Sequence, residues 1–314
     1  MSALVLILPI PSAAARAALV QPLARARQSG VPGGDWRAWL ARHVGATALA
    51  GLPPAHLAAT AIGVPPAGTW FATPVALVAA LDHVRMPADG WLTLAPDEAH
   101  ELSDAFAREF GGSGHSLAPV GAEGFLLSGL SASRVCTHDP ARVLAADIAP
   151  WLASGEGAAA ARRLGAELEM WLHGLPLNRA RARRGAAPIA TLWLWGGGEG
   201  GGAASAADAL GARPRGYGAD GWLRGLWAAL GLAVEGEAGA LGQVDIDPDA
   251  DTVVVVRQGV DEDVIECWCR PALAQLAARR VGSVQCVIDD RLFRFARFDL
   301  VKPWRRTVRW AATT

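Results

Sequence analysis

The chain has 314 residues, of which 52% are hydrophobic and 19% are charged. This balance excludes a disordered chain and supplies enough apolar residues for one large domain or two ordinary ones. The formal net charge is −1, so bulk electrostatics indicate neither nucleic acid nor an anionic membrane surface as a partner.

The first elements predict the start of an α/β fold. Residues 3–8 form a continuous apolar run of strand length, which is typical of a parallel strand buried on both faces. This run is too short for the apolar region of a signal peptide. Residues 13–27 and 36–44 predict helices on either side of a glycine- and proline-rich loop, and Pro53 and Pro54 open a further short helix.

The middle of the chain changes character. Residues 74–81 and 124–129 are short strand candidates, whereas residues 93–110 and 156–173 predict longer helices. We therefore expect an inserted α+β subdomain over residues 74–160.

The last part of the chain returns to alternating strands and helices. Apolar strand candidates lie at residues 190–195, 251–257 and 283–288, and helical segments at 220–232 and 264–280. Such alternation favours a parallel sheet with helices on both faces. We assign residues 1–73 and 161–314 to this α/β core.

The four cysteines give no metal or disulfide pattern. Cys267 and Cys269 form a C-x-C pair, which matches neither a zinc nor a thioredoxin-like spacing. Free buried thiols in a reducing cytosol are the favoured interpretation. No stretch has the length and apolar character of a membrane helix. We therefore expect a cytoplasmic protein that does not bind membranes or nucleic acid.

A glycine run follows the strand candidate that ends at Trp195. Six of the seven residues from Gly196 to Gly202 are glycine, and a strand followed by glycines can hold phosphate on its backbone N–H groups. A flexible loop and a dinucleotide fingerprint are the other interpretations, although no acidic residue follows on a next strand. A P-loop is excluded, because no Gly-Lys-Ser/Thr sequence is present.

An arginine cluster precedes this strand. Four of the six residues from Arg179 to Arg184 are arginine. Guanidinium groups bind phosphate through paired hydrogen bonds. A solvated arginine-rich turn is the alternative. The seven histidines show none of the spacings of a metal site, and no nucleophile elbow is present.

These two features together resemble a known family. Asn178-x-x-Arg181-x-x-x-Gly185-x-x-Pro188, followed by the strand and its glycines, resembles the signature of archaeal-type cofactor-independent phosphoglycerate mutases. It resembles still more closely their degenerate proteobacterial relatives, described as phosphoglycerate-mutase-like or RpfE-type regulatory proteins. Further similar segments are residues 91–102, 138–139, 147–148, 222–231 and 239–242.

The resemblance implies an alkaline-phosphatase-like parallel sheet core with helices on both faces and an inserted α+β subdomain. In active members of the family, two divalent metals polarise the phosphoryl group and a serine accepts it. The implied insert agrees with the one expected from the pattern of elements.

The positions of that machinery differ in this chain. The first strand ends Leu8-Pro-Ile-Pro11 where the family has Asp-Gly, and the serine-bearing helix start corresponds to residues 55–59, which contain no serine. Residues 257–263 lack the expected histidine, and Asp289-Asp290 replaces Asp-His. A two-metal site cannot be rebuilt from isolated carboxylates without the geometry that its ligand set imposes.

The sequence therefore predicts a pseudoenzyme: a catalytically inactive, mutase-like bacterial regulatory protein without metal, cofactor or catalytic residues. Its expected partners are a small phosphorylated metabolite and a protein. The expected phosphate-binding residues are Asn178, Arg181, Gly196, Gly197 and Gly198.

Two alternatives stay open. The first is a metal-dependent phosphoryl-transfer enzyme with rearranged ligands. Its candidate residues are Asp261, Asp263, Asp289 and Asp290 for metal, and Ser131 or Thr137 as nucleophile. The second is an interaction scaffold that binds no ligand.

Overall fold

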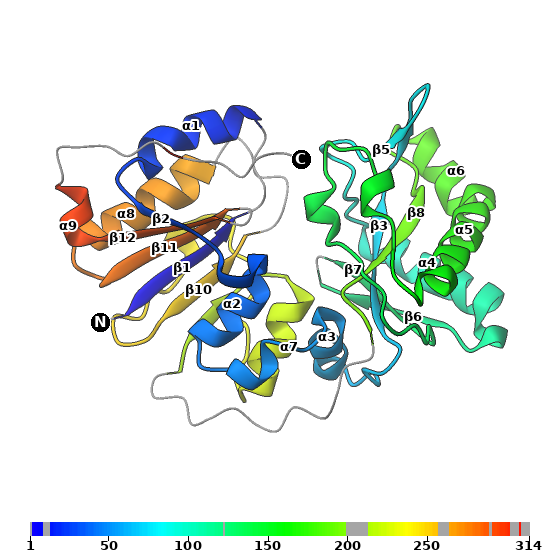
Figure 1. Ribbon diagram of the computed structural model, residues 1–314, viewed down its shortest axis with the longest axis horizontal. Helices are drawn as coiled ribbons and strands as arrows, with labels where there is room; N and C mark the ends of the chain where they lie inside the picture. Colours follow the sequence, from blue (N-terminus) through cyan, green and yellow to red (C-terminus); the bar gives the residue numbers. More distant parts are fainter. Residues whose placement is uncertain are drawn as a thin grey trace. The chain divides into compact units, whose positions relative to one another are not determined.

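The computed structural model describes residues 2–8, 13–121, 123–198, 213–256, 264–288, 291–301 and 308. The chain forms two compact units, drawn in Figure 1. Unit 1 combines residues 1–51 with 204–314, and unit 2 comprises residues 52–203.

Unit 1 contains a six-stranded sheet in the order β2-β12-β11-β1-β10-β9. Its strands are β1 (Ala3–Leu8), β2 (Arg27–Gly30), β9 (Arg215–Tyr217), β10 (Thr252–Val255), β11 (Ser283–Ile288) and β12 (Arg291–Ala296). The central strand β1 runs parallel to β10 and β11, and β9 is parallel to β10. At the other end of the sheet, β12 is antiparallel to β11, and the edge strand β2 is antiparallel to β12. The predicted strands at 3–8, 251–257 and 283–288 are thereby confirmed as neighbours in one partly parallel sheet.

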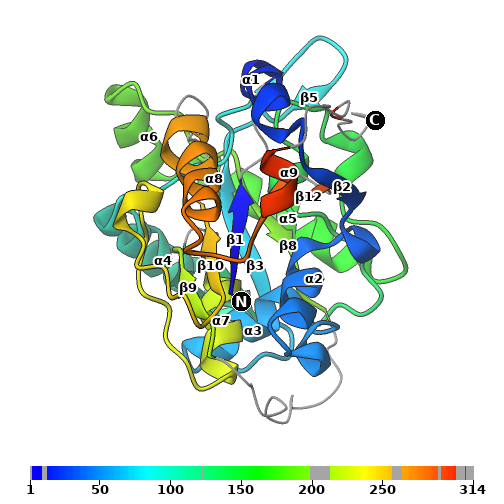
Figure 2. The same cartoon turned by 90° about the vertical axis from the view of Figure 1, so that its left-hand side faces the viewer.

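Helices cover both faces of this sheet, as Figures 1 and 2 show. They are α1 (Ala13–Leu23), α2 (Trp36–His43), α7 (Gly221–Ala229), α8 (Arg270–Ala277) and the short α9 (Arg297–Leu300). A turn of π-helix, Val264–Cys269, leads into α8. Helices α1 and α8 bury Leu19 and Leu276 against alternate residues of β1 and β11, including Leu4 and Val284. The predicted α/β class is confirmed, whereas the alkaline-phosphatase-like detail stays a prediction.

Unit 2 contains a separate four-stranded sheet in the order β6-β7-β3-β8, in which every neighbouring pair is antiparallel. The strands are β3 (Trp70–Val75), β6 (Ser116–Val120), β7 (Gly124–Ser128) and β8 (Thr191–Trp195), with a two-stranded ribbon of β4 (Val78–Ala79) and β5 (Val84–Arg85). The helices are α3 (Pro54–Ala61), α4 (Pro96–Phe110), α5 (Ala158–Gly174) and α6 (Pro176–Arg183). Helices α4 and α5 pack their apolar faces on this sheet, with Phe106 and Leu168 fully buried.

The strand at residues 190–195 does not belong to the parallel core, and that prediction is wrong. This strand, β8, pairs antiparallel with β3 in the sheet of unit 2. An apolar run reports that a strand is buried but not which strand it pairs with. As a result, the division of the chain falls at residues 51 and 203 rather than at 74 and 160. The arginine-rich segment before β8 is a helix, α6, rather than a turn.

Two further expectations concern thiols and membranes. All four cysteines are free; Cys269 and Cys286 are buried as expected, Cys267 is half-buried, and Cys136 is exposed. The expected burial of the cysteines is therefore confirmed for two of the four. Across the described ranges, none of the helices is both long enough and apolar enough to span a membrane.

Candidate functional site

The glycine loop at the end of β8 is held from the side of its carbonyl groups. We use this name for Gly196–Gly198, since residues 199–202 of the glycine run lie outside the described residues. The N–H of Ala55 donates to the Gly196 oxygen at 2.8 Å. Nε2 of His56 lies 2.8 Å from the Gly198 oxygen, and because a carbonyl can only accept, this ring nitrogen carries a proton. The first turn of α3 therefore supplies both donors.

Packing beneath the middle of the loop requires glycine. A Cβ on Gly197 would overlap the indole ring of Trp70 and lie 2.5 Å from the Thr69 oxygen. Trp70 and Thr69 are fully buried. Side-chain hydrogen bonds hold them in place, at 3.0 Å from Trp70 Nε1 to the Leu130 oxygen and at 2.7 Å from Thr69 Oγ1 to the Pro65 oxygen. The loop therefore lies directly on a rigid floor.

The N–H groups of the loop are less occupied than its carbonyls. The N–H of Gly196 donates to Thr137 Oγ1 at the long distance of 3.3 Å. The N–H groups of Gly197 and Gly198 donate to no acceptor in the part of the chain that the structure describes. All three glycines are half-buried, and a Cβ on Gly198 would meet no described atom within 4 Å. Clustered backbone N–H groups that meet no described acceptor are the kind of donor set that binds anions.

His56 brings a donor to this site without a charge. Its side chain is buried, with 6% of the residue exposed. Burial lowers the pKa of His56, and the hydrogen bond to Gly198 opposes that shift only in part. The ordinary pKa of histidine is about 6.5, so the ring is neutral at pH 7. The anion-binding capacity of the loop therefore comes from backbone dipoles rather than from a cation at His56.

Asn178 holds the fold together through its side chain. Nδ2 donates to the Leu172 and Ile189 oxygens at 2.8 and 2.9 Å, and Oδ1 accepts from the Ile189 N–H at 2.8 Å. Asn178 is 7% exposed. Its amide therefore ties the end of α5 to the segment that enters β8, with both polar atoms occupied.

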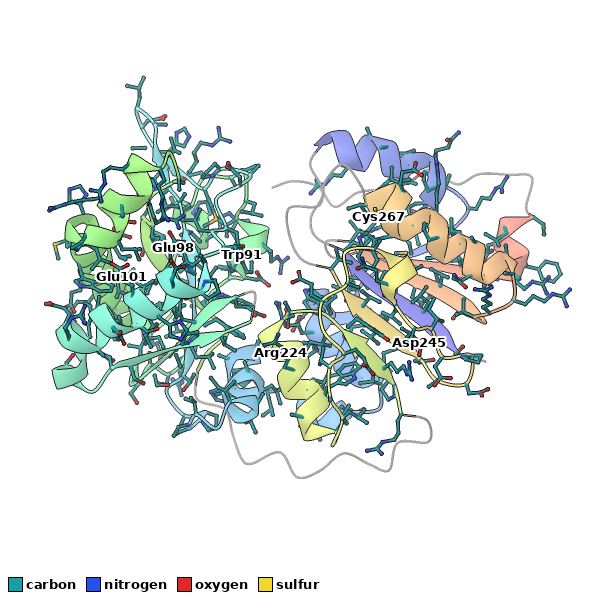
Figure 3. The ribbon with its side chains drawn as sticks, turned by 180° about the vertical axis from the view of Figure 1, so that it is seen from behind. Trp91, Glu98, Glu101, Arg224, Asp245 and Cys267 are labelled. Atoms are coloured by element: carbon teal, nitrogen blue, oxygen red, sulfur yellow. The ribbon has the colours of Figure 1, made fainter. Side chains whose placement is uncertain are left out.

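Arg181 is also engaged inside the protein. Its Nη1 lies 2.7 Å from Oε2 of Glu98 on α4, and its Nε donates to the Ala187 oxygen at 2.9 Å. The side chains of Arg181 and Glu98 are 6% and 8% exposed. Arg184, which is more exposed, reaches the other oxygen of the same carboxylate at 2.5 Å. Glu98 is labelled on α4 in Figure 3.

The structure does not bring these two residues to the glycine loop. Asn178 is bonded to Ile189 just before β8, whereas the glycines follow Trp195 at its other end. A strand rises about 3.3 Å per residue, so the seven steps from residue 189 to 196 separate the two places by roughly 20 Å. The expected pocket combining Asn178, Arg181 and the glycine loop is therefore divided into a structural cluster and a separate loop.

His56 and Thr137 lie at the loop although the set of expected phosphate-binding residues did not contain them. The resemblance matches residues 55–59 to a catalytic helix start, and this match is a sequence signal for His56. The sequence offers Thr137 as an alternative nucleophile, and the other candidate, Ser131, is exposed. The sequence does not predict that Thr137 lies near the loop, because Thr137 precedes Gly196 by 59 residues.

His138 and Asp139 are adjacent in the sequence, and their side chains have different described contacts. Asp139 accepts from the Ala141 N–H at 2.9 Å, while the His138 ring packs edge-on against Trp151. Burial first, and then the charge of Arg142, lowers the pKa of His138. Among the described residues no group of three or more His, Cys, Asp or Glu is arranged to hold a metal ion. The alternative ligands Asp261, Asp263, Asp289 and Asp290 lie outside the described residues.

The chain matches no protein-family model and no curated protein. Solved structures that are similar to it include the following two. A cofactor-independent phosphoglycerate mutase from Thermoplasma acidophilum DSM 1728 is 18% identical, with a TM-score of 0.38 over 94% of this chain and 90% of that one. The PH0037 protein from Pyrococcus horikoshii is 14% identical, with a TM-score of 0.43 over 94% of this chain and 87% of that one.

Proposed function

We propose that this chain is a phosphoglycerate-mutase-like regulatory protein of the cytoplasm that binds a phosphorylated metabolite and does not catalyse its conversion. The observation that carries the proposal is that the carbonyl groups and the N–H groups of the glycine loop are used differently. Its Gly196 and Gly198 carbonyls are tied to α3, while the N–H groups of Gly197 and Gly198 meet no described acceptor. Phosphate oxygens are well matched to such donors.

The start of α3 supports the absence of mutase chemistry. The resemblance places a serine nucleophile in the segment that is Ala55–Ala59 here, and none of these five residues carries a hydroxyl group. They are all buried, and the N–H of Ala55 is already bonded to Gly196. This helix start therefore offers a support for the glycine loop but no hydroxyl group that could accept a phosphoryl group.

The proposal assigns phosphate binding to Gly196, Gly197 and Gly198 and a structural role to Asn178 and Arg181. The bonds of Asn178 to Leu172 and Ile189 and of Arg181 to Glu98 support that assignment. An Arg181→Ala variant is therefore a probe of stability rather than of ligand binding.

Thermal unfolding of the full chain with and without 3-phosphoglycerate tests the binding function. A ligand that binds only the folded state adds about 2.7 kcal/mol of stability at 100 times its dissociation constant. We expect such a shift and, in a coupled assay with added Mn²⁺, no mutase or phosphatase turnover. Turnover that a chelator abolishes would refute the proposed inactivity. Absence of any shift with 3-phosphoglycerate and inorganic phosphate would favour a scaffold without ligand, and thus refute the binding function.

One observation favours the alternative of a phosphoryl-transfer enzyme. The Thr137 hydroxyl contacts the N–H of Gly196, so a nucleophilic oxygen does lie beside the candidate phosphate site. This alternative requires metal to bind and Thr137 to be essential. Elemental analysis after incubation with Mn²⁺ or Zn²⁺, together with activity of Thr137→Val, decides it: no bound metal at micromolar concentrations, or full activity of the variant, eliminates a Thr137-based enzyme.

A further inference from the structure

We infer that His56 is the positioning residue of the glycine loop, and that the loop takes tetrahedral oxyanions through neutral donors whose direction His56 sets. This inference rests on the proposed function of the same loop. It concerns a residue that no motif of the sequence assigned to phosphate binding.

Glycine gives the loop no conformational preference of its own. Gly196 and Gly198 adopt φ values of 65° and 142°, in a region that side-chain-bearing residues rarely enter. Because glycine populates many backbone conformations about equally, contacts rather than intrinsic sterics must select this one. The direction in which the N–H groups point is therefore decided by the residues that hold the loop.

The contacts of the loop are unevenly distributed along it. Gly196 is held on both sides, by Ala55 N–H at its oxygen and by Thr137 at its nitrogen. Gly197 rests on the Trp70 ring. For Gly198, the one hydrogen bond within the described residues is the 2.8 Å bond from His56. Loss of that bond removes the polar restraint on Gly198 that the described residues provide.

The chemistry of His56 suits this role. The ring is buried on α3, where the first turn also supplies the Ala55 N–H to Gly196. A neutral ring with its proton on Nε2 donates one bond to Gly198 and adds no charge. The anion is then recognised by N–H groups alone, so sulfate and inorganic phosphate, which share tetrahedral oxygen acceptors, are expected to bind with affinities within a few-fold of each other.

A matched pair of amide variants tests the inference in the full chain. In His56→Gln the amide nitrogen lies where Nε2 lies in histidine, so it can still donate to the Gly198 oxygen. In His56→Asn the shorter side chain places its amide near the position of Nδ1 and cannot reach that oxygen. Both variants bury one amide at the same place on α3, so destabilisation common to the pair is controlled for. The probes are inorganic phosphate and sulfate, with dissociation constants measured by calorimetry at pH 7.5.

We expect His56→Asn to bind both anions at least tenfold more weakly than the wild type, and His56→Gln to bind them within about threefold; a tenfold loss equals about 1.4 kcal/mol. Equal binding by the two variants would refute the positioning role while leaving phosphate binding by the loop intact. A wild-type protein that binds neither anion would instead refute the proposed function itself. Far-ultraviolet circular dichroism confirms that each variant is folded at the temperature of the titration.

Discussion

Glu98 of α4 offers the sharpest test of how unit 2 is held together. Its carboxylate accepts from the Ala95 N–H at 3.1 Å and from Arg181 and Arg184 at 2.7 and 2.5 Å. The two arginines differ in environment, because the Arg181 side chain is 6% exposed and the Arg184 side chain is 57% exposed. One carboxylate therefore makes a buried and an exposed ion pair at the same time.

The Glu98→Ala variant leaves the Arg181 guanidinium buried without its anion. Removing one partner of a buried pair costs about 3–5 kcal/mol, which corresponds to a fall in melting temperature on the order of 10 °C for a unit of this size. Arg184→Ala removes only the exposed pair and is expected to cost about 0–1 kcal/mol. The ratio of the two effects follows from burial, since both arginines contact the same group.

Urea unfolding followed by circular dichroism measures both effects. The transition of unit 2 should move to lower urea in Glu98→Ala and Arg181→Ala, and hardly at all in Arg184→Ala. An Arg184→Ala variant as destabilised as Arg181→Ala would refute the reasoning from burial. A Glu98→Ala variant whose free energy of unfolding is within about 1 kcal/mol of the wild-type value would also refute it, because a loss that small is typical of an exposed ion pair.

The same carboxylate has a pH signature. Burial by itself raises the pKa of Glu98, but the Ala95 N–H and the two arginines together outweigh burial and hold the pKa below its ordinary value. A lowered carboxyl pKa stabilises the folded state above the unfolded pKa of about 4.3, and this contribution is lost as the pH falls through the folded value. The difference in the free energy of unfolding between the wild type and Glu98→Ala should therefore become smaller below about pH 4.

Two other variants give clear expectations. Gly197→Ala places a methyl group against the Trp70 ring. It should weaken phosphate binding and lower stability by about 1–3 kcal/mol. An alanine variant with wild-type affinity for phosphate would contradict the rigid packing of Trp70 beneath the loop. The His43 ring, 3.4 Å from Asp251, is the main cause that lowers the pKa of Asp251, so Asp251→Asn should cost about 1 kcal/mol at pH 7 and progressively less below pH 4. Asparagine retains the oxygen that accepts the Ala3 N–H, and a loss that does not change with pH would contradict the charge-based explanation.

The sequence predicts the central strands of unit 1 because their burial requires a recognisable pattern of apolar residues. Ala3–Leu8 and Ser283–Ile288 lie at the centre of a sheet with helices on both faces, so both faces of each strand must be apolar. The antiparallel strands at the β2 end of the sheet show a weaker pattern. The edge strand β2 has the polar sequence Arg27–Gly30, because an edge strand is only partly covered. Its neighbour β12 carries arginines among its apolar residues. The apolar pattern predicts neither strand.

The partner of β8 was decided by tertiary structure alone. Its apolar sequence is compatible with either sheet, and only packing against β3 places it in unit 2. The same applies to the candidate site. The sequence brings Asn178, Arg181 and the glycines within 21 residues of one another, yet β8 runs between them and carries the two groups to its opposite ends.

By itself, then, the sequence determined the α/β class, the central strands and the glycine loop, because burial and backbone freedom are local requirements on residue type. Tertiary structure alone decided that His56 and Thr137 lie at that loop and that Arg181 faces Glu98. The physical reason is that hydrogen bonds and ion pairs depend on distance in space, and the chain path between two residues is set by packing rather than by their separation in sequence.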